Sequence, residues 1–291
     1  MNCKDVLELA RIHQYAKNLF VFLPGFFAFR LHEPAVFLDA CVAFAVFSLT
    51  ASAIYILNDW HDRHEDRNHP EKHRRPIASG RVTQMQAFLC LSVFLLAGLF
   101  LGYFSMPRIL PFIAGYLALN IAYTLRFKHR SILDVVFVSC GFVLRLFVGA
   151  QATGVSLSHW IIVMTFLLAL FLALAKRRDD SLIFEDTNHQ TRRVVDGYNI
   201  KFLDSAMVMT ASIVILAYIL WSISPATTSK LSSNNLFLTA IFVVLGILRY
   251  MQMAFVENKT GSPTKILLKD IFIQATLVGW VGSFVWIFYA R

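Results

Sequence analysis

The sequence predicts an all-α integral membrane protein, and two observations lead to this prediction: the composition and the length of the apolar stretches. Of the 291 residues, 57% are hydrophobic and only 15% are charged, and the mean hydropathy is +0.60. Apolar stretches of about 17–23 residues recur along the whole chain, and each can cross a bilayer as a helix. We therefore expect a bundle of transmembrane helices.

The apolar stretches predict nine spans. The first needs a special environment, because its continuous apolar part, Leu19 to Phe29, is short and contains Pro24. It spans only if the polar residues before it, such as Lys17, lie at membrane depth and face a wet cavity. The nine predicted spans cover residues 12–31, 35–57, 84–104, 108–126, 132–153, 159–176, 202–223, 235–253 and 268–289.

The basic residues predict the orientation. A net charge of +9 could indicate a nucleic-acid partner, but the lysines and arginines lie in the connections between apolar stretches, so we expect no nucleic acid. Of the 27 lysines and arginines, 22 fall on one predicted side. By the positive-inside rule, the N-terminus and two long polar loops, at about 58–83 and 176–201, are cytoplasmic. We expect one multi-pass domain, residues 1–291, in the cell (inner) membrane.

The stretch from Asn58 to Asp66, where the second span ends, carries the clearest chemical signal. Asp59, Asp62 and Asp66 are three and four residues apart, so on a helix they share one face. Carboxylates so placed repel one another unless a cation lies between them, and Mg²⁺ held by carboxylates commonly shares its other positions with substrate phosphates. A solvated helix end is the alternative interpretation. Against it, four basic residues follow at once: Lys72, Arg74, Arg75 and Arg81.

These aspartates are therefore the predicted catalytic residues and Mg²⁺ ligands. Arg145 is the next candidate, because a lone arginine in an apolar span is costly unless it is paired or hydrated. It could form a buried ion pair with another helix or bind the phosphate or polar head of a ligand, and we favour the second. Asp134 lies on the same helix face but three turns away. The full set of predicted substrate-binding residues is Lys17, Asn58, Lys72, Arg74, Arg75, Tyr123, Lys128, Arg145, Lys176, Arg177 and Arg178.

Several of these residues also have ordinary explanations. A lysine at a span end, such as Lys17, commonly extends to the membrane interface, and Tyr123 and Lys128 stand where interfacial anchors are usual. The cluster Lys176 to Arg178 could be a topology signal or a contact with lipid headgroups. Their shared cytoplasmic level is what favours a functional interpretation.

The pattern Asn58-Asp59-x-x-Asp62-x-x-x-Asp66 resembles the NDxxDxxxD signature of the UbiA prenyltransferase superfamily. The resemblance implies a UbiA-like helical bundle around a central cavity that opens to membrane lipids, with a diphosphate bound through Mg²⁺ at two aspartate-rich motifs. Other stretches resemble the decaprenyl-phosphate phosphoribosyltransferase branch: Lys17 to Pro24, Tyr55 to Asp59, His73 to Gly80, Gly141 to Arg145 and Ala175 to Arg178.

The second loop departs from the superfamily pattern. Neither Asp179 nor Asp180 has an acid four residues later, so a second DxxxD motif is missing. This favours 5-phosphoribosyl 1-diphosphate over a prenyl diphosphate as donor, since a 5-phosphate would bind the cations Lys176, Arg177 and Arg178 instead. The resemblance thus implies transfer of 5-phosphoribose to a polyprenyl phosphate, with release of diphosphate.

Two alternatives remain open at this point. One is an ordinary UbiA-type enzyme that moves a prenyl group from a prenyl diphosphate to an aromatic or other acceptor. The other is a transporter or channel with acidic gating residues. The second is disfavoured because the acids gather at one membrane face, whereas transporter sites lie near the midplane.

Overall fold

The computed structural model describes residues 1–68, 72–187, 197–231, 233–258 and 263–289. Within these residues all regular structure is helical, with no strand, which confirms the predicted all-α membrane class. Seven helices are long and apolar enough to span, and a shorter apolar helix covers Ile271–Ile287, so the exact number of nine is not confirmed. The seven are Pro34–His61, Gln84–Ser105, Pro107–Leu125, Leu133–Thr153, His159–Ile183, Ile200–Ser222 and Asn235–Phe255.

The chain forms two compact units. Unit 1 comprises Met1–Lys128 and Cys140–Leu157, and unit 2 comprises His129–Ser139 and Ser158–Arg291. The helix α7, Leu133–Thr153, gives its first turns to unit 2 and the remainder to unit 1. Each unit has an apolar core of its own, and one domain over residues 1–291 stays a prediction.

Unit 1 begins with three short helices, two of which cover most of the predicted first span 12–31. A short helix α1, Cys3–Ala10, is followed by a 3₁₀ helix η1, Ile12–Phe22, and by a short helix α2, Leu23–Phe27. Pro24 lies in the first turn of α2, where its missing N–H and fixed φ are tolerated, so η1 passes directly into α2 and residues 12–27 are helical without a gap.

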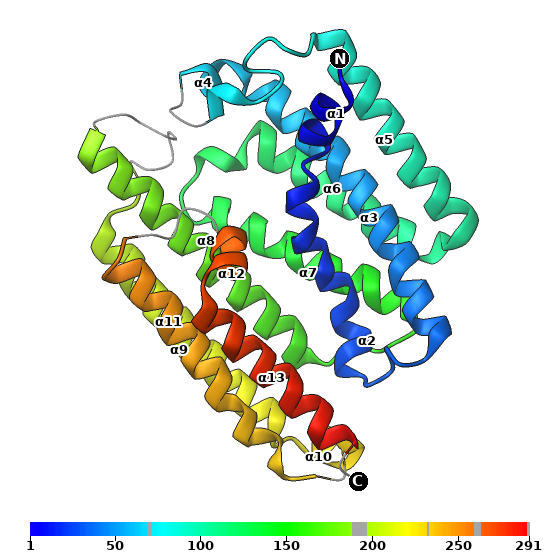
Figure 1. Ribbon diagram of the computed structural model, residues 1–291, viewed down its shortest axis with the longest axis vertical. Helices are drawn as coiled ribbons and strands as arrows, with labels where there is room; N and C mark the ends of the chain where they lie inside the picture. The colour runs from blue at the N-terminus through cyan, green and yellow to red at the C-terminus, as the bar shows by residue number, and fades with distance from the viewer. Residues whose placement is uncertain (69–71, 188–196, 232, 259–262, 290–291) are drawn as a thin grey trace. The chain divides into compact units, whose positions relative to one another are not determined.

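The long helices of unit 1 surround its apolar core. Helix α3, Pro34–His61, packs along α5, Gln84–Ser105 (Figure 1). The two backbones approach closely at Gly98, where a Cβ atom would lie 2.8 Å from Thr50 Cγ2. The 3₁₀ helix η3, Pro107–Ile109, leads into α6, Leu110–Leu125, which packs against α3. The buried core includes Val46, Phe47, Ile113, Tyr116 and Val148.

The predicted polar loop at 58–83 is largely structured. It contains the helix α4, Arg63–Arg67, and the 3₁₀ turn η2, Lys72–Arg74. Gly80 has φ +77°, a conformation that suits glycine, and a capping box of Thr83 with Gln86 then starts α5. A small core of Leu9, Ile56, Ile77, Val82, Ala87 and Cys90 joins α1 to this region.

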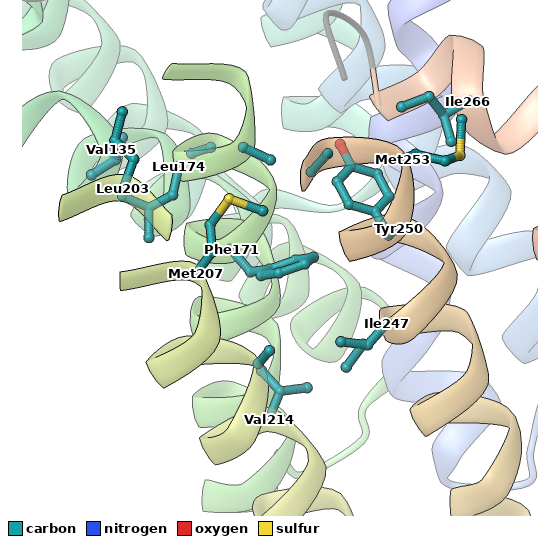
Figure 2. Packing of buried hydrophobic residues seen from close by; sticks show 14 of the residues in the cluster. Val135, Phe171, Leu174, Leu203, Met207, Val214, Ile247, Tyr250, Met253 and Ile266 are labelled. Carbon is teal, nitrogen blue, oxygen red and sulfur yellow. The ribbon is translucent and has the colours of Figure 1, made fainter. Parts of the chain in front are cut away.

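Unit 2 packs its helices around a separate apolar core, part of which Figure 2 shows: Phe171, Met207, Val214, Ile247 and Tyr250. Helix α8 continues to Thr187, beyond the predicted end at residue 176, because hydropathy marks the membrane boundary and not the helix end. The first part of the predicted loop 176–201 is thus helical, and residues 188–196 lie outside the described residues. The helices are α8, His159–Thr187; α9, Ile200–Ser222; α10, Pro225–Leu231; η6, Asn235–Thr239; α11, Ala240–Phe255; α12, Pro263–Lys269; and α13, Ile271–Tyr289.

Candidate active site

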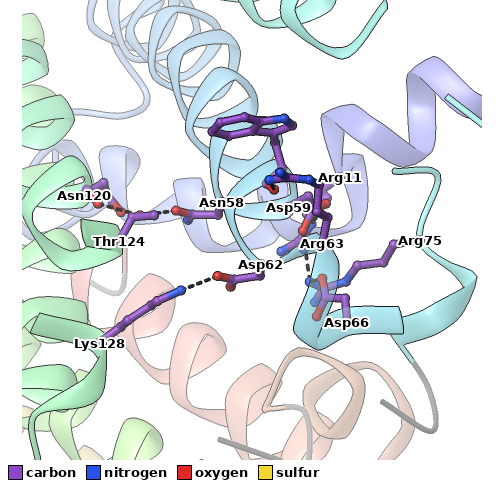
Figure 3. Close-up of polar contacts among 11 residues, drawn as sticks. Arg11, Asn58, Asp59, Asp62, Arg63, Asp66, Arg75, Asn120, Thr124 and Lys128 are labelled. Atoms are coloured by element: carbon purple, nitrogen blue, oxygen red, sulfur yellow. Dashed lines mark hydrogen bonds and ion pairs between the residues drawn. The ribbon is translucent and has the colours of Figure 1, made fainter. Parts of the chain in front are cut away.

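Two aspartates of the acidic motif converge on a single cationic atom (Figure 3). Arg75 Nη1 donates to Asp59 Oδ1 at 3.0 Å and to Asp66 Oδ2 at 2.6 Å. Asp59 lies in the last turn of α3 and Asp66 lies in α4, and both are buried, at 2% and 4% exposed. The two carboxylates therefore lie close together, as the sequence predicts, and the Arg75 guanidinium lies between them.

Asp62 binds a different cation. It caps the junction of α3 and α4, and its carboxylate forms an ion pair with Lys128. The Asp62 side chain is 28% exposed, whereas that of Lys128 is 9% exposed. Because α3 ends at His61, the three aspartates are not on one uninterrupted helix, and the third is directed toward the segment after α6.

Asn58 connects the same corner to α6. The Thr124 hydroxyl contacts Asn58 Oδ1 and the carbonyl oxygen of Asn120, which lies 2.8 Å away. Thr124 is buried at 2% exposed. This contact fixes the end of α3 against α6, so Asn58 positions the aspartates that follow it.

Arg11 is a site residue that the sequence did not single out. Its Nε donates a hydrogen bond to Asp59 Oδ2 at 3.2 Å, and its Nη2 donates to Asp59 Oδ1. The guanidinium carbon also lies 5.5 Å from the centroid of the Tyr55 ring. The backbone at Arg11 is left-handed, with φ 52°, which is uncommon for a residue with a side chain. No spacing signal links it to an acid 48 residues later.

The short helix α1 holds Arg11 in place. Arg81 Nη1 donates to Asp5 Oδ1 at 2.9 Å, and Arg81 Nη2 donates to Glu8 Oε2 at 2.5 Å. Ser52 Oγ donates to the carbonyl oxygen of Ala10 at 2.9 Å, which ties the end of α1 to α3. The N-terminal segment is thereby part of the site's framework.

The charges around Asp66 act in opposite directions. Burial raises the pKa of its carboxyl above the ordinary 3.8, while Arg75 and, to a smaller extent, Lys72 oppose this shift. Arg74, also predicted to bind substrate, is exposed, and its backbone carbonyl accepts from Arg81 at 2.9 Å. Tyr123 lies in the last turn of α6.

A second polar group lies deeper in unit 1, around Arg145. Arg145 is 4% exposed, and its Nε donates to Asn18 Oδ1 at 3.0 Å and its Nη1 to the Gly141 carbonyl at 2.8 Å. Asn18 is fully buried and donates in turn to Ser48 Oγ at 3.0 Å. Of the two interpretations of Arg145, a buried ion pair receives no support within the described residues.

The predicted second-loop cations belong to unit 2, in which carboxylates bind two of them. Arg177 Nε donates to Asp134 Oδ2 at 2.5 Å and its Nη1 to Asp180 Oδ2 at 2.6 Å. Arg178 Nε donates to Asp204 Oδ1 at 2.6 Å. Both guanidinium groups are buried and fix α8 within unit 2. A phosphate-binding role for Lys176, Arg177 and Arg178 stays a prediction.

Long apolar helices, with an arginine–carboxylate cluster where α3 ends, define a multi-pass membrane protein with a polar site suited to an anionic ligand. A model described as the UbiA prenyltransferase family matches residues 18–288. The chain belongs to that family and is a UbiA-type membrane transferase.

Known proteins are similar to this chain over nearly its whole length. Decaprenyl-phosphate phosphoribosyltransferase of Mycolicibacterium smegmatis is 30% identical over 96% of this chain and 90% of that protein. The protein of the same name from Corynebacterium glutamicum is 29% identical over 98% of this chain and 86% of its own length. A solved UbiA homolog from Archaeoglobus fulgidus, bound to GPP and Mg²⁺, superposes on this chain with a TM-score of 0.73. The match covers 97% of this chain and 99% of that one at 18% sequence identity, so it shows a shared fold.

Proposed function

We propose that this enzyme transfers 5-phosphoribose from 5-phosphoribosyl 1-diphosphate to a polyprenyl phosphate and releases diphosphate. The observation that carries the proposal is the 30% identity, over 96% of the chain, to the Mycolicibacterium decaprenyl-phosphate phosphoribosyltransferase. The cluster of Asp59, Asp62 and Asp66 with Arg11, Arg75 and Lys128 is compatible with it, since cations and carboxylates together can bind a metal-complexed diphosphate.

A magnesium ion fits the acidic pair. Arg75 Nη1 already occupies a point where oxygen atoms of Asp59 and Asp66 converge, so these two carboxylates can hold one cation. Within the described residues no three acidic, histidine or cysteine side chains gather into a metal site, so further ligands would come from the substrate phosphates, with Asp62 as the third candidate. When bound, Mg²⁺ would supply positive charge to the departing diphosphate.

The chain's own cations supply the remaining charge. In the reaction the bond between ribose C1 and the diphosphate oxygen breaks, the diphosphate leaves with the electron pair, and an oxygen of the lipid phosphate bonds to C1. The cations Arg11, Arg75 and Lys128 pair with carboxylates in the structure and can bind diphosphate oxygens when the donor is present. The lipid phosphate is already anionic, so no general base is needed.

The proposed orientation places this site at the cytoplasmic face of the cell membrane. The support is the excess of lysine and arginine on one predicted side, 22 of 27. A soluble, highly charged donor would then reach the acidic motif from the cytoplasm, and the polyprenyl phosphate would enter from the membrane. This orientation and a single functional domain over residues 1–291 are part of the proposal.

The matched family is a prenyltransferase family, which favours a second candidate: transfer of a prenyl group from a prenyl diphosphate to an aromatic or other acceptor. Purified enzyme in detergent, supplied with each donor and acceptor pair, separates the two. We expect diphosphate release and a lipid-linked phosphoribose only with 5-phosphoribosyl 1-diphosphate and a polyprenyl phosphate. Turnover of the prenyl diphosphate alone would contradict the proposal.

Substitution of Asp62 tests the role of the motif. Asp62→Asn is expected to reduce kcat at least about a hundredfold, since a metal-bound leaving group contributes several kcal/mol of transition-state stabilisation. Asp39→Asn is the matched control, because Asp39 lies near the opposite end of α3 and its Oδ2 is 3.7 Å from Nη2 of exposed Arg108. Activity that persists in Asp62→Asn, or in excess EDTA, would remove the motif from the chemistry.

A further inference from the structure

Two positive side chains in unit 1, Lys17 of η1 and Arg145 of α7, lie together without an acidic partner. Lys17 immediately precedes Asn18, whose Oδ1 accepts from Arg145 Nε at 3.0 Å, so the two cations belong to one polar group. Arg11 is bound to Asp59, whereas neither Lys17 nor Arg145 forms an ion pair with any carboxylate in the described part of the chain. Every other buried arginine of the described residues has such a partner.

Arg145 is held instead by neutral groups. Its guanidinium carbon lies 4.9 Å, 5.3 Å and 5.0 Å from the ring centroids of Phe47, Tyr116 and Phe142. Ring faces and the Gly141 carbonyl orient the guanidinium, but they carry no negative charge with which to neutralise it. Burying a cation without a counter-ion is costly, so the arrangement is suited to an anion that arrives with a ligand.

The residues around Lys17 and Arg145 indicate which kind of anion these cations bind. Phe47 and Tyr116 are buried in helices apolar enough to span a membrane, and Asn18 holds the Arg145 Nε from the buried side. Two cations with apolar walls suit a phosphate monoester attached to a hydrocarbon chain. A ribose 5-phosphate has the same phosphate group but no apolar part to bury against the rings.

We infer that Lys17 and Arg145 bind the phosphate of the polyprenyl phosphate acceptor, with Asn18 as a positioning residue that orients the Arg145 guanidinium. This inference rests on the proposed function for the identity of the lipid. It separates the two substrates by chemistry: the metal-complexed diphosphate is bound at the carboxylates, and the lipid phosphate is bound at cations that have no carboxylate beside them.

Thermal unfolding of the purified enzyme in detergent, with farnesyl phosphate as the probe, tests the inference. Farnesyl phosphate is expected to raise the wild-type Tm, and farnesol, which lacks the phosphate, is expected to leave it unchanged. Lys17→Met should weaken farnesyl phosphate binding at least about tenfold, because a charge-assisted contact is lost. Arg145→Lys should retain part of the binding, since it keeps the charge and loses the planar donor fork.

The Tm of the ligand-free variants distinguishes binding from structure. Because Lys17 and Arg145 repel each other, Lys17→Met is expected to keep or raise the Tm of the ligand-free enzyme, whereas a structural lysine would lower it on removal. Arg30→Met is the control for loss of an arginine, since the Arg30 side chain is 42% exposed and paired with Glu33. It should retain the full response to farnesyl phosphate.

Two results would overturn the inference: an unchanged farnesyl phosphate response in Lys17→Met, or a Tm response to ribose 5-phosphate that Lys17→Met abolishes while farnesyl phosphate has no effect. Failure of the proposed function looks different. In that case farnesyl phosphate still binds through Lys17, which supports the site, while 5-phosphoribosyl 1-diphosphate is not consumed.

Discussion

Replacing Arg11 with methionine is expected to lower the free energy of unfolding by about 2–3 kcal/mol. The change removes both bonds from the guanidinium to Asp59, a carboxylate that is 2% exposed. Leaving a buried carboxylate with no cation costs roughly 3–5 kcal/mol. Asp59 keeps Arg75 at 3.0 Å, and the Arg11 side chain is itself 19% exposed, so the cost falls below that range. The corresponding loss in Tm is roughly 5–10 °C.

Magnesium should reduce this difference. Because Arg11 and Mg²⁺ would both neutralise Asp59, the ion replaces the charge that the substitution removes, and Arg11→Met should bind Mg²⁺ more tightly than the wild type. Unfolding followed by tryptophan fluorescence, with and without MgCl₂, measures both effects. Arg30→Met is the control, because an ion pair with side chains 42% and 39% exposed contributes at most about 1 kcal/mol.

Two results would refute this reasoning. A Tm equal to that of the wild type would show that Asp59 does not depend on Arg11. A difference in Tm that widens with MgCl₂ would show that the arginine and the ion do not compete for the same carboxylate.

Three further predictions concern other parts of the chain. Because burial raises the pKa of Asp66 and the charged form is required, kcat/KM should fall on the acid side at a higher pH than an ordinary carboxyl with pKa 3.8 would give, as a pH–rate profile will show. In a cysteine-free background, a membrane-impermeant thiol reagent applied to intact cells should label Ser105→Cys and not Ser79→Cys; the reverse would invert the proposed orientation. Arg177→Met should destabilise the protein by about 3–5 kcal/mol, because buried Asp134 loses its arginine. A normal Tm with a raised KM for the donor would contradict this and support the predicted phosphate-binding role.

Hydropathy was sufficient to locate most membrane helices, because a span must satisfy its backbone internally and remain apolar for about 20 residues. The predicted spans 35–57 and 84–104 compare with Pro34–His61 and Gln84–Ser105 in the structure. The predicted first span, 12–31, corresponds to a 3₁₀ helix that passes into the short helix α2 and ends at Phe27, so its helix type and end were not predicted. The α8 boundary was wrong for a different reason, since a helix can continue into water.

The acidic motif was predictable as a cluster, but its partners were not. Periodicity relates residues within one helix, so it can bring Asp59 and Asp66 together. It carries no information about which distant cation meets them. The contacts of Arg11 with Asp59, and of Arg145 with Asn18, join residues 48 and 127 positions apart. Such pairs are determined by tertiary packing.

The bonds that hold α1 also have a consequence for how the enzyme is made. Asp5 and Glu8 bind Arg81 across 76 and 73 residues, and Met1 Sδ lies 3.7 Å from the thiol of Cys90. Helix α1 therefore cannot form these contacts until the chain has been synthesised as far as the start of α5. Arg11, which follows α1, likewise has its carboxylate partner only once Asp59 at the end of α3 has been synthesised, 48 residues later.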